Sequence, residues 1–151
     1  LEAVSKKISA QLLLSRIPHT DSKEPPYLRR LSTSWKYQVM EVLPRFEVFQ
    51  LFSLFDKMVI IKDQLDLNHE KDFFKSLETA SISHLADFNK KQLMDIIWVF
   101  VQLGITPPSE EFVSAWRESA MTKRRKFSAQ DRYGLHGFFR QLEITPLSYP
   151  Y

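Results

Sequence analysis

The clearest pattern of hydrophobic and polar positions lies between residues 88 and 104, in the stretch FNKKQLMDIIWVFVQLG. Apolar residues recur there at intervals of three and four, at Leu93, Ile96, Ile97, Phe100 and Leu103. This spacing places them on one face of an α-helix, whereas polar residues such as Lys91 and Asp95 fall mostly on other faces. The stretch therefore predicts an amphipathic helix, and Gly104 is its candidate C-cap.

The residues after this helix predict a joint between two helices. Pro107 and Pro108 cannot continue a helix, and Ser109 offers an oxygen that can cap the next one. We expect that next helix to cover residues 110–122 and to end before the cation run 123–126, because cations suit the negative end of a helix.

The same criteria predict five further helices, so that seven are expected in all. Ser128 and Asp131 form a capping-box pair at the start of the last helix. Toward the N-terminus we expect helices over residues 4–16, 27–42, 44–58 and 64–79. Only three glycines occur in the chain, which disfavours a fold rich in β-turns. The predicted class is all-α.

Two phrases of the chain nearly copy each other: QLGITP at residues 102–107 and QLEITP at residues 141–146, which lie 39 residues apart. The alignment extends beyond them, since it places Phe88 over Phe127 and Phe100 over Phe139. Prominent apolar residues also recur 15 positions apart in three places, as the pairs Leu28 and Leu43, Phe73 and Phe88, and Phe112 and Phe127.

An earlier copy of the second helix is found in FEVFQLFSLFDKMVI, where we align Phe55 with Phe100, Met58 with Leu103 and Ile60 with Ile105. A period of roughly 39 residues made of two helices indicates an α-solenoid of about three helix-turn-helix repeats. The alternative is a plain helical bundle whose leucine-rich helices resemble one another by chance.

The two copied phrases differ at one position, Gly104 against Glu143. Glycine takes the left-handed conformation of a helix C-cap at low cost and glutamate does not. We therefore expect Glu143 to mark a terminal or degenerate joint.

Residues 107–146 resemble the octotricopeptide repeat, with a proline start, Trp116 about nine residues on and a leucine-x-x-x-proline close. Residues 88–107 are similar to the second helix of that repeat and of the related FAST-kinase-like and RAP-associated helical repeats, through Ile97-Trp98-Val99 and Leu103-Gly104. The resemblance implies single-stranded RNA binding, as in organelle gene-expression factors. Similar repeats also occur in proteins of intracellular bacteria.

Composition supports one folded domain over residues 1–151, which we take to be a piece of a longer protein because it begins with leucine. The chain is 44% hydrophobic and 26% charged, with a net charge of +3. The absence of cysteine excludes disulfides and thiolate nucleophiles and suits an intracellular compartment, whether an organelle matrix, a bacterial cytoplasm or the cytosol of a host. The longest apolar stretch, residues 96–105, is about half the length of a membrane-spanning helix.

The chemistry of an enzyme is not evident in the sequence. The four histidines are scattered, and the three glycines form no phosphate-binding loop. The oxygen-rich stretch DQLDLNHE, residues 63–70, lacks the central glycine of a calcium loop and is interpreted as a solvated loop. We predict no catalytic residue, no metal and no cofactor.

The strongest functional feature is the run of four cations Lys123, Arg124, Arg125 and Lys126, which could neutralise phosphates. Further candidates for nucleic-acid contact are the polar helix positions Lys90, Gln92, Arg132 and Arg140. Trp98 and Trp116 could stack on bases, although such helical positions more often belong to a core. The cation run could equally be an ordinary solvated turn.

We therefore predict a non-catalytic module that binds single-stranded RNA along a basic groove. The alternative is a protein-interaction scaffold, for example a domain of a bacterial effector or of a larger regulatory protein, since solenoids commonly bind proteins and a charge of +3 is low for an RNA-binding protein.

Overall fold

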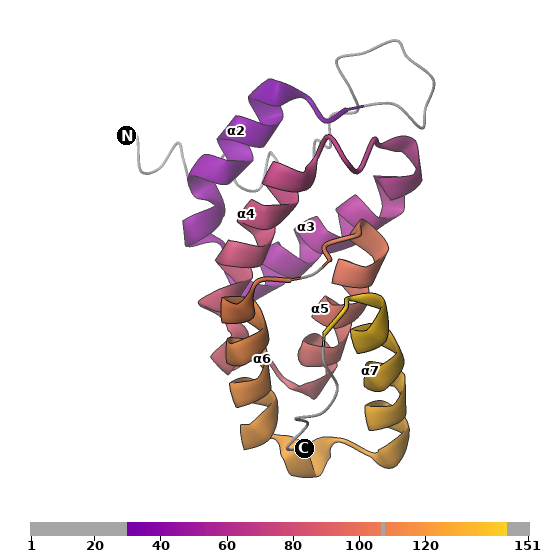
Figure 1. The fold of residues 1–151 in the computed structure, drawn as a ribbon. Helices are drawn as coiled ribbons and strands as arrows, with labels where there is room; N and C mark the ends of the chain where they lie inside the picture. The colour runs from indigo at the N-terminus through magenta and orange to yellow at the C-terminus, as the bar shows by residue number, and fades with distance from the viewer. Residues whose placement is uncertain (1–29, 107, 145–151) are drawn as a thin grey trace. The chain divides into compact units, whose positions relative to one another are not determined.

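The computed structural model describes residues 30–106 and 108–144 (Figure 1). These residues form α-helices and short 3-10 helices, with no β-strand among them, so the predicted all-α class is confirmed. The α-helices are α2 (Thr33–Val42), α3 (Val48–Ile61), α4 (Lys71–Ile82), α5 (Lys90–Leu103), α6 (Glu110–Thr122) and α7 (Ala129–Gln141). The 3-10 helices are η2 (Leu43–Arg45), η3 (Lys62–Gln64), η4 (Leu85–Asp87) and η5 (Arg124–Lys126).

The chain divides into two compact units, and the boundary between Leu77 and Glu78 lies inside α4. In the N-terminal unit the largest fully buried side chains are Leu31, Leu51, Leu54, Phe55, Met58, Phe73 and Leu77. In the C-terminal unit they are Phe88, Phe100, Phe112, Trp116 and Phe139. Each unit therefore has an aromatic and aliphatic core of its own.

The predicted helix ends are correct where a cap and an apolar stripe agree. Helix α6 covers the predicted residues 110–122, and the side chain of its N-cap Ser109 accepts a hydrogen bond from the N–H of Phe112 at 3.1 Å. Helix α5 begins one residue after its N-cap Asn89 and ends at Leu103, inside the predicted stretch.

Five predicted boundaries, three helix starts and two helix ends, are wrong, and the predicted helix over residues 4–16 lies outside the described residues. Helix α3 ends at Ile61 rather than at residue 58, and α4 ends at Ile82 rather than at residue 79. Helix α2 begins at Thr33 rather than at residue 27, after the N-cap Ser32. Helix α3 begins at Val48 rather than at residue 44, because Pro44 belongs to η2 and the two residues after η2, Phe46 and Glu47, are extended. Helix α4 begins at Lys71 rather than at residue 64, because η3 and a turn precede it.

One local arrangement recurs at three places in the chain. Each of η2, η4 and η5 is followed by a buried phenylalanine in extended conformation, and its N–H donates to the carbonyl of the first residue of the 3-10 helix. These phenylalanines are Phe46, Phe88 and Phe127.

A capping interaction then starts each following α-helix, where the N3 side chain accepts from the N-cap N–H. The bonds measure 3.0 Å for Glu47 and Gln50, 3.0 Å for Asn89 and Gln92, and 2.9 Å for Ser128 and Asp131.

This arrangement corrects the predicted register of the earliest copy. Phe46 takes the place of Phe88, so the first spacing is 88 − 46 = 42 residues, against 127 − 88 = 39 for the second. The predicted pairings of Phe55 with Phe100, Met58 with Leu103 and Ile60 with Ile105 assumed a spacing of 45 residues and are therefore wrong by three. Burial shows the difference, since Ile60 is 76% exposed and Ile105 is 9% exposed. The sequence alignment rests on apolar residues alone. The register of the copies is defined by the 3-10 turn, the phenylalanine after it and the cap of the following α-helix.

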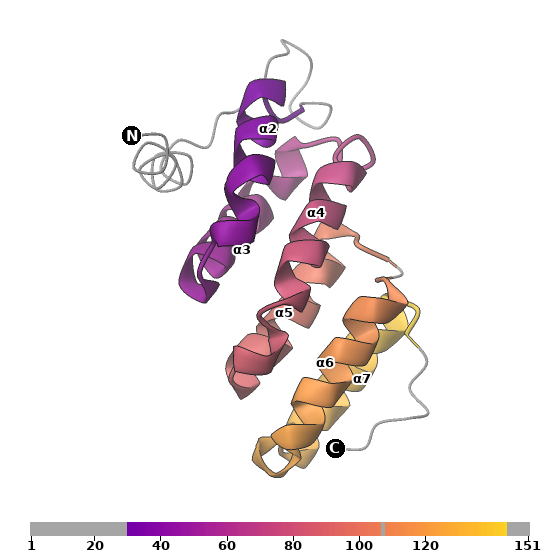
Figure 2. The ribbon, with the colours of Figure 1, turned by 90° about the vertical axis from the view of Figure 1, so that its left-hand side faces the viewer.

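The C-terminal unit packs its helices around aromatic contacts. Helices α6 and α7 lie side by side and antiparallel, and η5 joins the end of α6 to the start of α7 (Figure 1, Figure 2). The indole Nε1 of Trp116 donates to the carbonyl of Leu93 on α5 at 2.8 Å, and its ring meets Phe139 of α7 edge to face with centroids 5.1 Å apart. Phe112 of α6 stacks on Phe100 of α5 at 4.6 Å. Trp116 thus joins all three helices.

Helices α5 and α7 end in the same way, although one joint has glycine and the other glutamate. Gly104 has φ of 69° and Glu143 has φ of 60°. The N–H of the next residue bonds to the phenylalanine carbonyl five positions back in both, Ile105 to Phe100 at 3.0 Å and Ile144 to Phe139 at 2.8 Å. Glu143 therefore adopts the left-handed conformation that its side chain disfavours.

We expect Glu143→Gly to raise the free energy of unfolding by about 1 kcal/mol, because glycine adopts a positive φ without steric cost. Gly104→Ala should lower it by a similar amount at the equivalent joint. Urea denaturation followed by circular dichroism measures both changes. Gly134→Ala is the control: this glycine lies inside α7 with open space around it, so alanine should stabilise there. Equal signs for all three changes would contradict the assignment.

Candidate nucleic-acid interface at the turn between α6 and α7

The four predicted cations lie on and beside η5, but they do not share one role. Lys123 is half-buried, and its Nζ donates to the carbonyl of Ala86 and to Oγ of Ser119, both at 3.4 Å. It therefore ties the end of α6 to η4. The side chains of Arg124, Arg125 and Lys126 are exposed and make no hydrogen bond or ion pair with any described residue. These three remain open to a polyanion.

Lys90 lies at the start of α5 and binds an acid at the start of α7. Its Nζ is 3.0 Å from Oδ2 of Asp131. The backbone N–H of Ser128 and then the Lys90 ammonium hold the pKa of Asp131 below the usual range of an aspartate. The carboxylate of Asp131 already balances the charge of Lys90. Lys90 therefore attracts a phosphate less strongly than the exposed cations of η5 do.

The remaining predicted contacts are divided between structural and open positions. Gln92 accepts the capping hydrogen bond from Asn89, and Nη2 of Arg132 donates to the carbonyl of Phe127 at 3.3 Å. Arg140 is exposed near the end of α7. At 1.5 Å per helical residue it lies about 16 Å along the helix from Ala129. The structure thus gathers Lys90 and Arg132 beside the η5 turn and leaves Arg140 at the far end of α7.

The tryptophans that could stack on bases take opposite positions. Trp116 is 1% exposed and belongs to the core, whereas Trp98 is 39% exposed on α5. The sequence prediction missed Tyr133, which is 84% exposed one residue after Arg132. An aromatic residue among polar residues, outside the apolar stripe of its helix, was the available signal.

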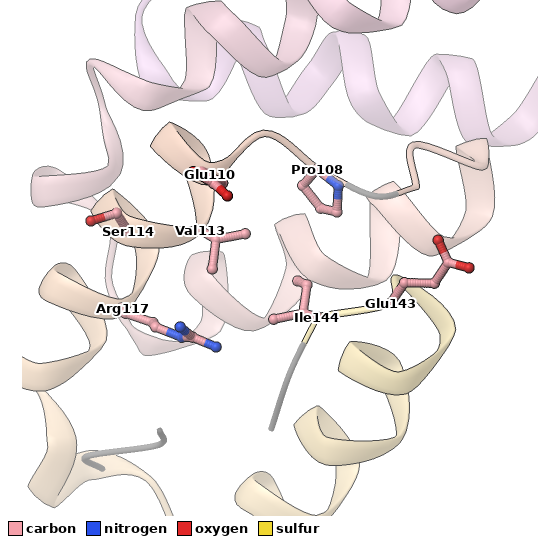
Figure 3. A pocket seen from close by; sticks show the side chains of 7 residues that line it. All are labelled: Pro108, Glu110, Val113, Ser114, Arg117, Glu143 and Ile144. Atoms are coloured by element: carbon pink, nitrogen blue, oxygen red, sulfur yellow. The ribbon is translucent and has the colours of Figure 1, made fainter. Parts of the chain in front are cut away.

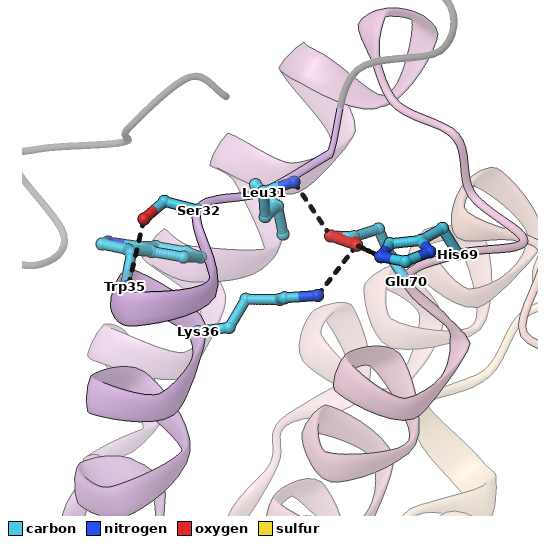
Figure 4. A network of polar contacts seen from close by, with 6 residues as sticks. All are labelled: Leu31, Ser32, Trp35, Lys36, His69 and Glu70. Carbon is cyan, nitrogen blue, oxygen red and sulfur yellow. Dashed lines mark hydrogen bonds and ion pairs between the residues drawn. The ribbon is translucent and has the colours of Figure 1, made fainter. Parts of the chain in front are cut away.

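The N-terminal unit contains a buried carboxylate held by polar contacts (Figure 4). Glu70 is fully buried; its Oε2 accepts from the N–H of Leu31 at 3.2 Å and its Oε1 from Nζ of Lys36 at 3.0 Å. Nε2 of His69 lies 4.0 Å from the same Oε1. The interpretation of residues 63–70 as a solvated loop is therefore wrong for Glu70, whose contacts lie 34 and 39 residues away in sequence.

Within residues 30–106 and 108–144, no three acidic or histidine side chains come together in a way that could hold a metal ion. None of the helices in this part of the chain has the length and apolar character needed to cross a bilayer. Comparison with known proteins finds no matching family model, no matching curated protein and no matching solved structure.

Proposed function

We propose that the chain is a non-catalytic helical-repeat module of the octotricopeptide-like kind, an α-solenoid that binds single-stranded RNA through the turn between α6 and α7. One observation carries the proposal: Arg124, Arg125 and Lys126 are exposed, adjacent and without a polar partner among the described residues. Three such cations at one turn can replace counterions along a phosphate backbone.

The turn geometry itself does not require these cations. The equivalent turns η2 and η4 have the sequences Leu-Pro-Arg and Leu-Ala-Asp and place the same buried phenylalanine after them. The run Arg-Arg-Lys is therefore an addition to the local template. A surface feature that the fold does not need is a better candidate for binding than one that repeats with the structure.

Aromatic side chains complete the chemistry that single-stranded nucleic acid prefers. Tyr133 is 84% exposed and lies four residues, about one turn of helix, beyond the start of α7, the helix that follows η5. Base stacking on an exposed aromatic ring tolerates any sequence, and a neighbouring cation holds the phosphate. We assign Tyr133 as the stacking residue of this interface.

The test compares two triple variants with the same change in net charge. Arg124→Glu, Arg125→Glu and Lys126→Glu are combined in one, and the exposed cations Arg30, Arg45 and Lys71 are changed to glutamate in the control. Binding of a labelled single-stranded RNA is measured by fluorescence anisotropy over a series of salt concentrations. The turn variant should weaken binding at least about tenfold and reduce the salt slope by about 2, since each phosphate contact contributes about 0.7.

The control variant should retain most of the affinity. Absence of binding by the unmodified protein at low salt, or equal losses in the two variants, would remove the basis of the RNA proposal. The ultraviolet absorbance ratio of the purified protein gives an early answer, because co-purified nucleic acid raises absorbance at the wavelength of the bases.

A protein-interaction scaffold is the second candidate, and exposed apolar residues on α3 favour it. Phe49 is 61% exposed and Ile60 is 76% exposed. They are 11 residues apart, three turns of a helix, so they lie on one face. If the scaffold is correct, a partner protein binds this face, and Phe49→Ser abolishes that binding while the charge changes at η5 leave it intact.

A further inference from the structure

An exposed serine, Ser128, lies beside the cations of η5 and caps α7. Ser128 and the residue before it, Phe127, both have extended backbone conformations, and Phe127 is 3% exposed. Successive side chains of an extended chain point to opposite sides, so Phe127 enters the core and Ser128 faces outward. Oγ of Ser128 accepts from the N–H of Asp131 at 3.0 Å and keeps its own proton to donate.

The residues before Ser128 have the charge pattern of a kinase substrate. Arg125 and Lys126 stand three and two positions before the serine, and Phe127 separates them from it. Both cations are exposed and make no ion pair with a described residue. A serine kinase whose substrate groove is acidic selects its substrates by such cations, because opposite charges attract and wrong partners are repelled.

Ser109, the N-cap of α6, has the same cap and the opposite charges around it. Its Oγ accepts from the N–H three residues on at 3.1 Å, against 3.0 Å for Ser128. Two prolines precede Ser109 in the sequence, and Glu110 and Glu111 follow it. The two serines therefore differ in the charge of their neighbours and hardly at all in local geometry.

The surroundings of the start of α6 are also rich in acid. A cavity of about 550 Å³ lies beside the first half of this helix, and Arg117 extends into it (Figure 3). Among the described residues that line the cavity, the carboxylates of Glu110 and Glu143 accompany this guanidinium. An acidic kinase groove is therefore repelled near Ser109 and attracted near Ser128.

We propose that Ser128 is a phosphorylation site for an arginine-directed serine kinase and that its phosphate turns off RNA binding at η5. The effect on RNA rests on the proposed function. In the transfer, Oγ of Ser128 attacks the γ-phosphorus of ATP on the kinase and gives its proton to a carboxylate of the kinase. The new bond from phosphorus to Oγ replaces the bond to the β-phosphate oxygen, and ADP leaves with the bonding electron pair.

Few hydrogen bonds oppose the opening of η5 that a kinase requires. A kinase binds its substrate as an extended chain, and Phe127 and Ser128 already have this conformation. The backbone bonds across η5 join the N–H of Lys126 to the carbonyl of Lys123 at 2.9 Å and the N–H of Phe127 to that of Arg124 at 3.3 Å. The helical bonds of α7 begin at the carbonyl of Ser128 and do not depend on them.

A phosphate on Ser128 would change the charge of the turn without displacing α7. It carries about two negative charges at neutral pH and so offsets about two of the three exposed cations of η5. The N-terminus of a helix favours an anion. The neighbouring carboxylate of Asp131 is balanced by Nζ of Lys90 at 3.0 Å, which limits repulsion from the phosphate.

The first experiment locates the phosphate. The full chain is incubated with ATP and the catalytic subunit of cyclic-AMP-dependent protein kinase, and peptide mass spectrometry reads each serine separately, including Ser9 and Ser32, which also follow two cations and an apolar residue. Ser128 should be phosphorylated and Ser109 should not. Arg125→Ala should slow the modification of Ser128 at least about tenfold, whereas the exposed Arg45→Ala should not.

The second experiment measures RNA binding before and after kinase treatment by fluorescence anisotropy. Phosphorylation should weaken binding at least about tenfold and reduce the salt slope by about 1.4, since two cations are offset and each contributes about 0.7. The control is Ser128→Asn, which keeps a capping oxygen and cannot be phosphorylated, so the same treatment should leave its affinity unchanged. Ser128→Asp has nearly the same shape as Ser128→Asn and one more negative charge, and it should bind more weakly.

Absence of phosphate at Ser128, or equal modification of Ser109, would overturn the proposal and leave the RNA function standing. Phosphorylation without loss of affinity would overturn it as well, as would a loss of helical circular dichroism, because RNA binding would then be lost through unfolding. If the untreated chain fails to bind RNA, the proposed function is wrong and the switch is overturned with it. The phosphate and the untreated affinity are separate readouts, so the two failures are distinguishable.

Discussion

Trp116→Ala is expected to lower the free energy of unfolding by about 3–5 kcal/mol, the largest effect of any single change proposed for this chain. The side chain is 1% exposed, so its removal leaves a cavity among α5, α6 and α7. It also removes the hydrogen bond from Nε1 to the buried carbonyl of Leu93 and the edge-to-face contact with Phe139. Both losses add to the cost of the lost packing.

Urea denaturation followed by circular dichroism measures this effect, with Trp98→Ala as the matched control. Trp98 is 39% exposed, and its removal should cost about 1 kcal/mol or less. Trp116→Phe should lie between the two, because it keeps an aromatic ring and loses only the indole N–H. If Trp98→Ala costs as much as Trp116→Ala, the core described for the C-terminal unit is incorrect.

Glu70→Ala is expected to cost about 3 kcal/mol, because it breaks a buried ion pair from one side. The Leu31 N–H and the Lys36 ammonium would both lose their acceptor. The side chain of Lys36 is 17% exposed, so water compensates only in part. Glu70→Gln should be milder, since an amide oxygen can still accept one of the two hydrogen bonds.

The control is an exposed ion pair on the same chain. Lys91 and Asp95 lie 2.8 Å apart on α5, with side chains 81% and 43% exposed. Asp95→Ala should change the free energy of unfolding by about 0.5 kcal/mol or less, because solvent screens such pairs. Thermal and urea unfolding of both variants measure the difference. Equal effects of Glu70→Ala and Asp95→Ala would show that Glu70 is more solvated than the structure indicates.

The accuracy of the predicted helices depended on how far along the chain their determining contacts reach. Helix α6 was predicted with correct bounds because Ser109 caps it three residues from its partner Phe112. The predicted start of α4 is seven residues too early. Nothing in the sequence near Gln64 shows that Glu70, the residue before α4, binds Leu31 and Lys36. The apolar residues of that stretch could equally have continued a helix.

The candidate RNA interface shows the same division. The sequence identified the run of cations, and the structure shows that Arg124, Arg125 and Lys126 are exposed at η5. It could not show that Lys90 meets Asp131, 41 residues away, or that Lys123 binds the carbonyl of Ala86, 37 residues away. A count of charges does not reveal which of them are already paired.

The sequence by itself determined the all-α class and three helix caps, namely the C-cap Gly104 and the N-caps Ser109 and Ser128. It also determined that the joints at Gly104 and Glu143 are similar. Each of these features depends on contacts within about five residues. Only the tertiary structure decided the register of the earliest copy, the burial of Glu70 and the cavity at Arg117. Those features require side chains from distant helices to meet, and their energies are set by burial and by the choice of partner. A local pattern of apolar and polar residues contains neither.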